Sequence, residues 1–328
     1  MNEYNKIFTV KECLDLFFCD AESRLHDTTI KNYRNKMKAF LEFIQEQKSK
    51  PLDQIYMNDI SRADMTAYQK YLRNMNRFKD HPTLPKSTTG LSNNTIRDYI
   101  TKLNIFFRFC LSNEYMDYDI ITGMKLIRPE KKDKLPLYQS EVDQLNARFK
   151  NRSETNYRNL CILHLMLDAG LRPEEVVKLK LKDVNFEKGY LSIENSKGYK
   201  SRYIRMSKRL KKYLLNYKTC YRGAGSGKDS FILKIGSREP ITNSSIKMVF
   251  DRLKKSTGID RLYPYLCRHT FASSFLLGGG NLESLRVLMG HSDISTTQQY
   301  LHISNQYGTI ADDIYKLGND FLDIYYRK

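Results

Sequence analysis

The chain has 328 residues, and 55 lysines and arginines against 37 acidic residues give it a net charge of +18. This length suits two domains, 41% hydrophobic residues are enough for their cores, and the excess charge predicts a polyanionic partner. No apolar run approaches the ~20 residues that span a bilayer, and the first residues lack a signal peptide, so we expect a cytoplasmic protein that does not enter a membrane.

The first third of the chain, residues 1–124, is predicted to be a helical domain. Thr9-Val-Lys-Glu12 has the pattern of a capping box, in which the Thr and Glu side chains each bond to the other's backbone amide. Apolar stripes at helical spacing follow, and the clearest of them runs from Ile96 to Cys110. Lysines and arginines occupy the other faces, so we expect four helices whose basic outer surfaces bind DNA.

Residues 125–137 are predicted to be an extended linker between two domains. They contain two prolines and a dense run of charged residues, a composition that does not continue a helix. Such a run is either a solvated tether or a segment that lies along DNA phosphates, and the sequence favours neither.

Residues 138–328 are predicted to form a second domain, in which helices alternate with short strands. Strands are expected at 190–194 and 201–206, on either side of a turn at 195–198, and at 230–235. Helices are expected at 140–150, 156–169, 207–217 and 242–255. The predicted fold class is therefore mainly α with a small β-sheet (α+β).

The chain ends in an apolar stripe that predicts an amphipathic helix and consists of Ile310, Ile314, Leu317, Phe321 and Ile324. A terminal helix can dock on its own domain or on another molecule. We expect it to connect protomers, so that truncation after Ser304 should impair assembly more than folding of the monomer.

The stretch from Arg268 to Tyr300 contains three side chains of the types that enzymes use for catalysis. Arg268 can clamp an anion, His291 can handle a proton, and Tyr300 offers a hydroxyl nucleophile. A helical DNA-reading module without activity would show the same succession of short helices and Gly turns. Two upstream residues favour catalysis: Arg172, which precedes a Pro that can begin a helix, and Lys197 at a hairpin tip.

Each upstream residue also has a simpler interpretation. Arg172 alone is typical of a surface arginine between two helices. Lys200, Arg202 and Arg205 follow Lys197, and a basic hairpin usually makes general phosphate contacts. Only the combination of these residues with the Arg268–Tyr300 stretch favours an active site.

We expect neither a cofactor nor a metal. Arg222-Gly-Ala-Gly-Ser-Gly-Lys-Asp229 is similar to a phosphate-binding P-loop, but Arg222 stands where that motif needs Gly, and Asp229 where it needs Ser or Thr. The six cysteines lack CxxC spacing, which indicates reduced thiols rather than zinc ligands or disulfides. His164 lies on an apolar helix and is interpreted as a core histidine.

Together, these motifs resemble the catalytic domain of the tyrosine recombinases, the family of phage and transposon integrases and Xer-type recombinases. Gly170-Leu-Arg-Pro-Glu-Glu-Val is similar to the first Arg box, Lys197-Gly-Tyr-Lys-Ser-Arg to the Lys box and Arg268-His-Thr-Phe-Ala to the second Arg box. The stretch from Leu288 to Tyr300 is similar to the His and nucleophile box. The likeness covers about residues 138–305, and residues 9–124 resemble the family's core-binding domain less specifically.

The resemblance implies that Tyr300 attacks a backbone phosphorus of DNA and forms a 3′-phosphotyrosine without ATP or metal. Arg172 and Arg268 would bind the non-bridging oxygens and His291 would donate a further hydrogen bond. Lys197 would protonate the departing 5′-oxygen. These are the five residues to which the resemblance assigns catalysis.

Two supporting residues are less closely defined. Glu175 is expected to orient its neighbours. Tyr265 stands where the family's second Arg box usually has His, and a tyrosine is a poor proton acceptor near pH 7 because its pKa is about 10. The group that deprotonates Tyr300 therefore stays open, with Tyr265 as a weak candidate.

The resemblance further implies a site-specific recombinase or integrase of a mobile element, which joins double-stranded DNA sites as a homotetramer. An accessory DNA-bending protein is a further expected partner. Because the stretch before Thr9 is short, we expect no additional arm-binding domain. The rival functions are a type IB topoisomerase, which relaxes supercoils without pairing sites, and a DNA-binding regulator without activity.

Overall fold

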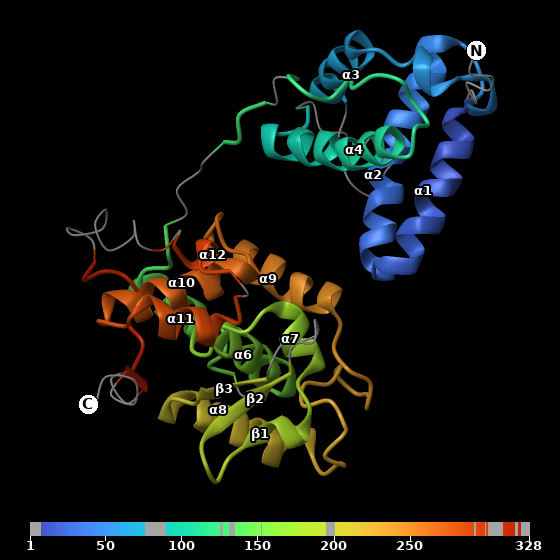
Figure 1. Cartoon of the computed structure of the whole chain (residues 1–328). Coiled ribbons are helices and arrows are strands. Elements are labelled where there is room, and N and C mark those ends of the chain that lie inside the picture. Colours follow the sequence, from blue (N-terminus) through green and yellow to red (C-terminus); the bar gives the residue numbers. More distant parts are fainter. Residues whose placement is uncertain are drawn as a thin grey trace, which may run out of the picture. The chain divides into compact units, whose positions relative to one another are not determined.

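The computed structural model describes residues 8–75, 90–124, 127–130, 135–151, 153–194, 201–291, 293–298, 300, 311–318 and 321–322. The chain divides into two compact units, Met1–Lys132 and Asp133–Lys328, each with its own hydrophobic core (Figure 1). The architecture is mainly helical with one small antiparallel sheet, which confirms the predicted fold class. No helix within these ranges is long and apolar enough to cross a membrane.

The described residues of the first unit form the expected four helices, α1 (Val10–Arg24), α2 (Asp27–Lys48), α3 (Arg62–Asn74) and α4 (Asn93–Ser112), with 3₁₀ turns η1 (Leu52–Gln54) and η2 (Met57–Asp59). The predicted capping box begins α1. Thr9 Oγ1 accepts from the Glu12 amide at 3.3 Å, and Glu12 Oε2 accepts from the Thr9 amide at 2.9 Å. These bonds satisfy backbone amides that have no partner within the helix.

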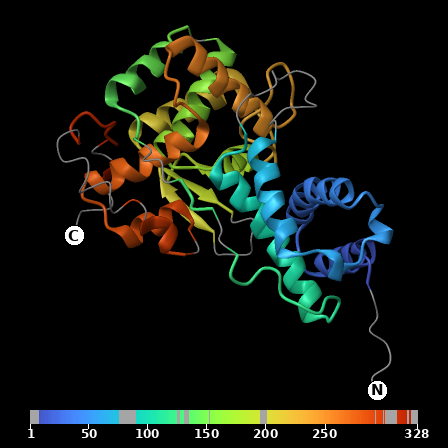
Figure 2. The same cartoon turned by 90° about the horizontal axis from the view of Figure 1, so that it is seen from above.

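The apolar stripes of these helices meet in an aromatic core. Helix α4 contacts the other three helices, and Figure 2 shows the four as one bundle, coloured blue to cyan. The buried rings of Phe106 and Phe107 on α4 meet Phe17 of α1 and Phe40 of α2 edge-on, with centroids 5.5 and 5.7 Å apart. Edge-to-face packing adds to the stabilisation from burial. The unit is thus held by the faces that the sequence pattern indicated.

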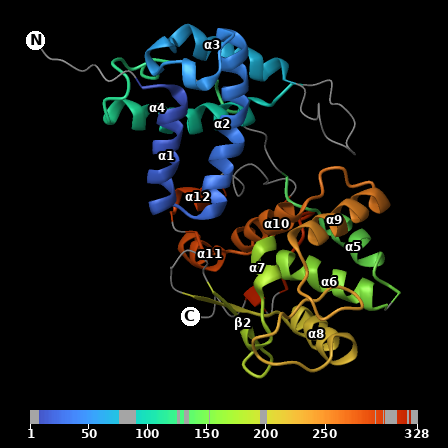
Figure 3. The same ribbon diagram turned by 90° about the vertical axis from the view of Figure 1, so that its right-hand side faces the viewer.

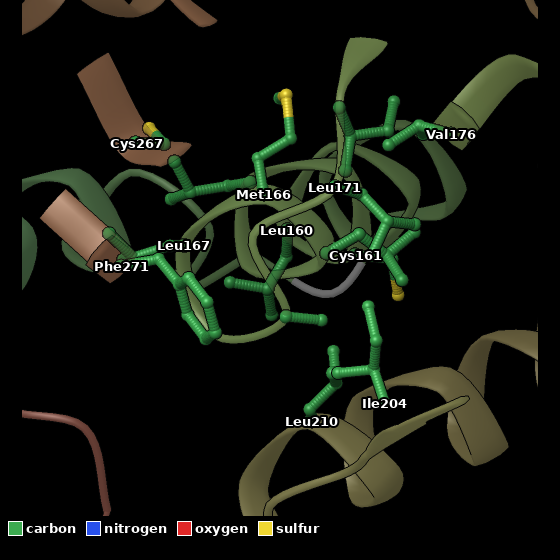
Figure 4. Close-up of a cluster of buried hydrophobic side chains, with 14 of the residues drawn as sticks. Leu160, Cys161, Met166, Leu167, Leu171, Val176, Ile204, Leu210, Cys267 and Phe271 are labelled. Carbon is green, nitrogen blue, oxygen red and sulfur yellow. The ribbon is translucent and has the colours of Figure 1, made fainter. Parts of the chain in front are cut away.

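The second unit is built around α6 (Glu154–Leu167), whose side chains from Tyr157 onward are all buried. Figure 4 shows buried side chains of this helix together with those of the helices that pack against it, including Val176 of α7, Leu210 of α8 and Phe271 of α10. His164 is fully buried and bonds to Asp168 and Asn146, which confirms its interpretation as a core histidine. The other helices are α5 (Gln139–Ala147), α7 (Pro173–Lys178), α8 (Lys208–Tyr217), α9 (Asn243–Thr257), α10 (Pro264–Leu277), α11 (Leu282–Met289) and α12 (Ser295–Gln298), with shorter turns η3 (Leu181–Asp183) and η4 (Lys218–Arg222).

The sheet of this unit has three antiparallel strands in the order β1 (Val184–Asn185), β2 (Tyr190–Ile193) and β3 (Arg202–Arg205). Strands β2 and β3 confirm the predicted pair. Alternate side chains of β3 face the core, because Arg202 and Ile204 are buried whereas Tyr203 is 64% exposed.

The strand predicted at 230–235 is wrong. Ser230 and Leu233 form only isolated bridges, to Lys180 and Pro240, and the third strand of the sheet is β1. Phe231 and Ile232, which lie between Ser230 and Leu233, are nevertheless buried. A short apolar run indicates burial, but it does not say which backbone conformation is buried.

The terminal helix predicted over 310–324 is also wrong for residues 311–318, and of the described residues in this segment only Phe321 and Leu322 are helical. Residues 311–313 form a turn, Ile314 makes an antiparallel bridge to Tyr138, and residues 315–318 have no regular secondary structure. Ile314, Leu317 and Phe321 are at most 3% exposed and belong to the core of the same unit. Truncation after Ser304 is therefore expected to impair folding of the monomer, contrary to the expectation from sequence.

A buried polar cluster ties this segment to α6 and α8. The Tyr315 hydroxyl and the Arg209 guanidinium both donate to Asp168, Arg209 with two bonds of 2.8 and 3.0 Å, and His164 Nδ1 lies 3.0 Å from the same carboxylate. Burial opposes ionisation of Asp168, but the charges of His164 and Arg209 outweigh this effect and hold the pKa of Asp168 well below its usual value. The carboxylate therefore stays ionised and anchors the end of the chain.

Candidate active site

Arg172 is placed by a tight turn between α6 and α7. Gly170 in this turn has a φ of +63°, and a Cβ there would lie 2.5 Å from the ring of Phe271, so the turn requires glycine. Arg172 is the N-cap residue of α7, and its backbone amide donates to Glu175 Oε2 at 2.8 Å. The Arg172 side chain is 30% exposed, and its guanidinium donates to Glu175 Oε1 at 3.1 Å and to the Gly290 carbonyl at 3.3 Å. The side chain thus spans from α7 to the end of α11.

Arg268 lies on α10 and is buried beside Arg172. Its guanidinium donates to the carbonyls of Gly170 and Met289, and Nη2 lies 3.2 Å from His291 Nε2. Burial, together with the charge of Arg172, lowers the pKa of Arg268 to about 9. Arg268 is still charged at pH 7, so the site holds two adjacent cations.

His291 follows α11 directly and has a defined tautomer. A guanidinium only donates, so Nε2 accepts from Arg268 and the ring proton sits on Nδ1, which donates to Thr297 Oγ1 at 2.9 Å. Burial and the charge of Arg268 lower the pKa of His291 to about 4. The imidazole is therefore neutral at pH 7 in this arrangement.

Tyr300 is close enough to Arg268 and Arg172 to interact with their positive charges. The side chain is 6% exposed, its amide donates to the Thr297 carbonyl at 3.0 Å, and its ring centroid lies 5.3 Å from that of His269. Burial raises the pKa of the Tyr300 hydroxyl, and the positive charges of Arg268 and Arg172 act against that rise. The cations that can bind a phosphate would thus also stabilise a phenolate.

The C-terminal end of α11 gathers the arginines of the site. The last carbonyls of a helix lack partners within it and carry the negative end of the helix dipole. Here three consecutive carbonyls each accept from a different guanidinium, and the next residue is His291. The pairs are Leu288 with Arg202, Met289 with Arg268 and Gly290 with Arg172.

Glu175 is the carboxylate at the centre of these guanidinium groups. It accepts from Arg172 and, at 2.8 Å, from Arg202 Nη2, and it lies 3.9 Å from Arg268. Burial opposes ionisation, but the hydrogen bond and charge of Arg202 outweigh it and hold the pKa of Glu175 below its usual value. Three guanidinium groups against one carboxylate leave an excess of two positive charges among the described residues of the site. Such an arrangement favours an anion.

The structure brings together four of the five predicted catalytic residues, Arg172, Arg268, His291 and Tyr300, from elements that converge on one side of the second unit (Figure 1 and Figure 3). Lys197 lies outside the described residues. Tyr265 is 46% exposed, and its hydroxyl donates to Glu174 Oε2 at 3.3 Å. Burial and the charge of Glu174 raise the pKa of Tyr265.

Sequence reasoning missed two residues of the site, and it misinterpreted the first of them, Arg202, as a general phosphate contact. The signal was present, because Arg202 alternates in phase with the apolar Ile204 and should therefore face inward. Thr297 was also missed, and no sequence signal identifies it. Within the described part of the chain, no group of three or more His, Cys, Asp or Glu residues could hold a metal ion.

Each of the two units matches a known protein family. The model of the phage integrase family matches residues 136–307, and that of the phage integrase SAM-like domain matches residues 12–126. Tyrosine recombinase XerC of Staphylococcus aureus (strain USA300) is 26% identical over 290 residues, which cover 87% of this chain and 89% of the relative.

Two solved structures share the fold. The Tn1549 transposon integrase in complex with a circular intermediate DNA has a TM-score of 0.69 at 18% identity, over 89% of this chain and 94% of that one. A lambda integrase tetramer bound to a Holliday junction has a TM-score of 0.68 at 16% identity, over 90% and 78% of the two chains.

Proposed function

The chain belongs to the phage integrase family of tyrosine recombinases, enzymes that break and rejoin DNA, and on this premise we propose that Tyr300 is the nucleophile of its active site. The observation that carries the proposal is the excess of two positive charges beside a buried tyrosine. A phosphodiester supplies the matching anion. Its phosphorus is the electrophile that a tyrosine hydroxyl attacks.

In the proposed reaction, the Tyr300 hydroxyl releases its proton to water, its oxygen forms a bond to phosphorus, and the bond from phosphorus to the 5′-oxygen breaks. Arg172 and Arg268 stabilise the charge that collects on the non-bridging oxygens. Lys197 supplies the proton with which the 5′-oxygen leaves as a hydroxyl. Rejoining reverses these steps with the 5′-hydroxyl of another strand, so the bond energy is kept in the phosphotyrosine.

His291 contributes a hydrogen bond that depends on its charge state. In the present arrangement Nε2 accepts from Arg268 and cannot donate. A phosphodiester bound at Arg268 would raise the pKa of His291 from about 4, because the anion favours the imidazolium. The protonated Nε2 would then donate to a non-bridging oxygen, and Glu175 would hold Arg172 in place.

We further propose that the enzyme pairs two double-stranded DNA sites in a homotetramer, on the ends of a mobile element. The tetramer is supported by the lambda integrase assembly on a Holliday junction, and the mobile element by the fold shared with a transposon integrase. Mapping the cleavage positions on the two ends of the element tests this role. Cleavage confined to a single chromosomal site would instead indicate resolution of chromosome dimers.

The nucleophile is tested with a nicked suicide substrate, from which the short fragment that carries the released 5′-hydroxyl diffuses away, so that the phosphotyrosine is trapped. Tyr300→Phe should bind DNA as the wild type does and form no covalent complex on a denaturing gel. Tyr56→Phe, at an exposed tyrosine of the first unit, is the matched control and should keep full activity. A covalent complex with Tyr300→Phe would refute the assignment.

A further inference from the structure

Arg202 sits where the hairpin joins the site. It is the first residue of β3 and pairs with Ile193, the last residue of β2. Its neighbour Tyr203 faces solvent, whereas the Arg202 side chain is 6% exposed. The Arg202 guanidinium therefore lies inside the protein, where Nε and Nη2 both bond to other elements of the site.

The contacts of Arg202 join three separate elements. Nε donates to the Leu288 carbonyl of α11 at 2.8 Å, and Nη2 donates to Glu175 Oε2 of α7 at 2.8 Å. The two bonds leave from different edges of one rigid planar group, so they fix the distance between α7 and the end of α11. A lysine offers a single ammonium and cannot reproduce this geometry.

Gly290 shows how closely the guanidinium is packed. A Cβ on Gly290 would lie 2.8 Å from Arg202 Nη1 and 3.1 Å from Cζ. Nη1 itself is buried and has no hydrogen-bond partner among the residues that the structure describes. The guanidinium thus lies against the backbone of Gly290, the residue that immediately precedes His291.

From these contacts we propose that Arg202 is a positioning residue of the active site. It holds Glu175, and through it Arg172, in register with the end of α11 that carries His291. The inference rests on the proposed function, because it assumes that Arg172 and His291 act on the phosphate. Arg202 itself does not touch the DNA.

The test separates DNA binding from chemistry. Arg202→Lys should lower the cleavage rate at saturating DNA by about 30-fold or more, since a misplacement near 1 Å can cost 10²-fold. The DNA concentration at half-saturation should stay within about threefold of the wild type, because no phosphate contact is lost. Arg238→Lys is the matched control, since Arg238 also donates to a carbonyl, that of Ala224, but in an exposed loop.

A charge-neutral linkage distinguishes positioning from a general loss of structure. In a methylphosphonate, a methyl group replaces one non-bridging oxygen, so less charge develops for the arginines to stabilise. Arg172→Ala and Arg202→Lys should both be less impaired on this substrate, relative to the wild type on the same substrate, than on ordinary DNA. A variant that is merely less well folded would be impaired equally on both.

The outcomes assign failure to one proposal or the other. If Arg172→Ala gains nothing from the neutral linkage, the proposed role of the guanidinium groups is wrong. If Arg172→Ala gains and Arg202→Lys does not, the Arg202 inference alone is overturned. Weaker DNA binding with an unchanged cleavage rate would also overturn it, since it would make Arg202 a DNA ligand.

Gly290→Ala is the second probe, for use if Arg202→Lys does not fold. It displaces the guanidinium without removing it, and because Gly290 has a φ of +60° it also strains the backbone beside His291. The expected pattern is the same: slower cleavage, unchanged half-saturation and partial recovery on the methylphosphonate. A wild-type cleavage rate in a folded Gly290→Ala variant would contradict the inference.

Discussion

Replacing Glu175 by Gln tests whether the arginines of the site are held by a single counter-charge. The substitution keeps the size of the side chain and one acceptor oxygen. It removes the negative charge that lies between Arg172, Arg202 and Arg268, so that three guanidinium groups face one another without an anion. The excess positive charge among these groups rises from two to three.

The expected loss of stability follows from the burial of the carboxylate. The Glu175 side chain is 14% exposed, and removing one partner of a buried ion pair costs about 3–5 kcal/mol. For a unit of this size, each kcal/mol shifts the midpoint of thermal unfolding by about 2–4 °C, which gives a decrease of about 6–20 °C. Cognate DNA should reduce this difference, because a phosphate replaces the missing anion.

Calorimetry of the wild type, Glu175→Gln and Glu174→Gln measures this effect. Glu174 is the neighbouring carboxylate, bonded only weakly to Tyr265 at 3.3–3.5 Å, and its substitution should cost little. Because the pKa of Glu175 is lowered from 4.5, its contribution is complete above pH 4.5 and is lost as the pH falls through the folded-state value. Equal midpoints for the two variants at pH 7 would refute the reasoning.

Three further predictions follow from the charges and buried bonds. DNA affinity should fall steeply with salt, by about 0.9 logarithmic units per neutralised phosphate for each tenfold rise in salt, and a flat response in a binding titration would contradict the basic surfaces as the DNA contact. The pKa of His291 is lowered from 6.5 to about 4, so between these pH values the unfolded chain binds a proton at His291 and the folded chain does not. Calorimetry should therefore show that the wild type loses more stability between pH 6.5 and pH 4 than His291→Gln does. Tyr315→Phe removes a hydroxyl that donates to the buried Asp168 and should cost about 1–3 kcal/mol in chemical denaturation, whereas Tyr203→Phe, at an exposed tyrosine, should cost almost nothing.

The sequence by itself determined the features that depend on neighbouring residues. The capping box at Thr9, the helical stripes of α1 to α4 and the alternation of β3 all arise from contacts within a few residues, so they are visible as local patterns. The candidate site was also predictable in part, because Arg172, Arg268, His291 and Tyr300 lie in motifs of recognisable residue order.

Only the tertiary structure decided how these residues are held. The carbonyl that accepts from Arg202 belongs to Leu288, 86 residues away, and no local pattern indicates that pairing. The same reason explains the end of the chain: the spacing of Ile314, Leu317 and Phe321 predicted which side chains are buried. At Ile314, however, a backbone bridge to Tyr138 replaced the expected helix, and of the described residues in this segment only Phe321 and Leu322 are helical. A buried backbone takes whichever hydrogen-bond partners the folded protein places beside it, and those partners are set by the packing of distant segments.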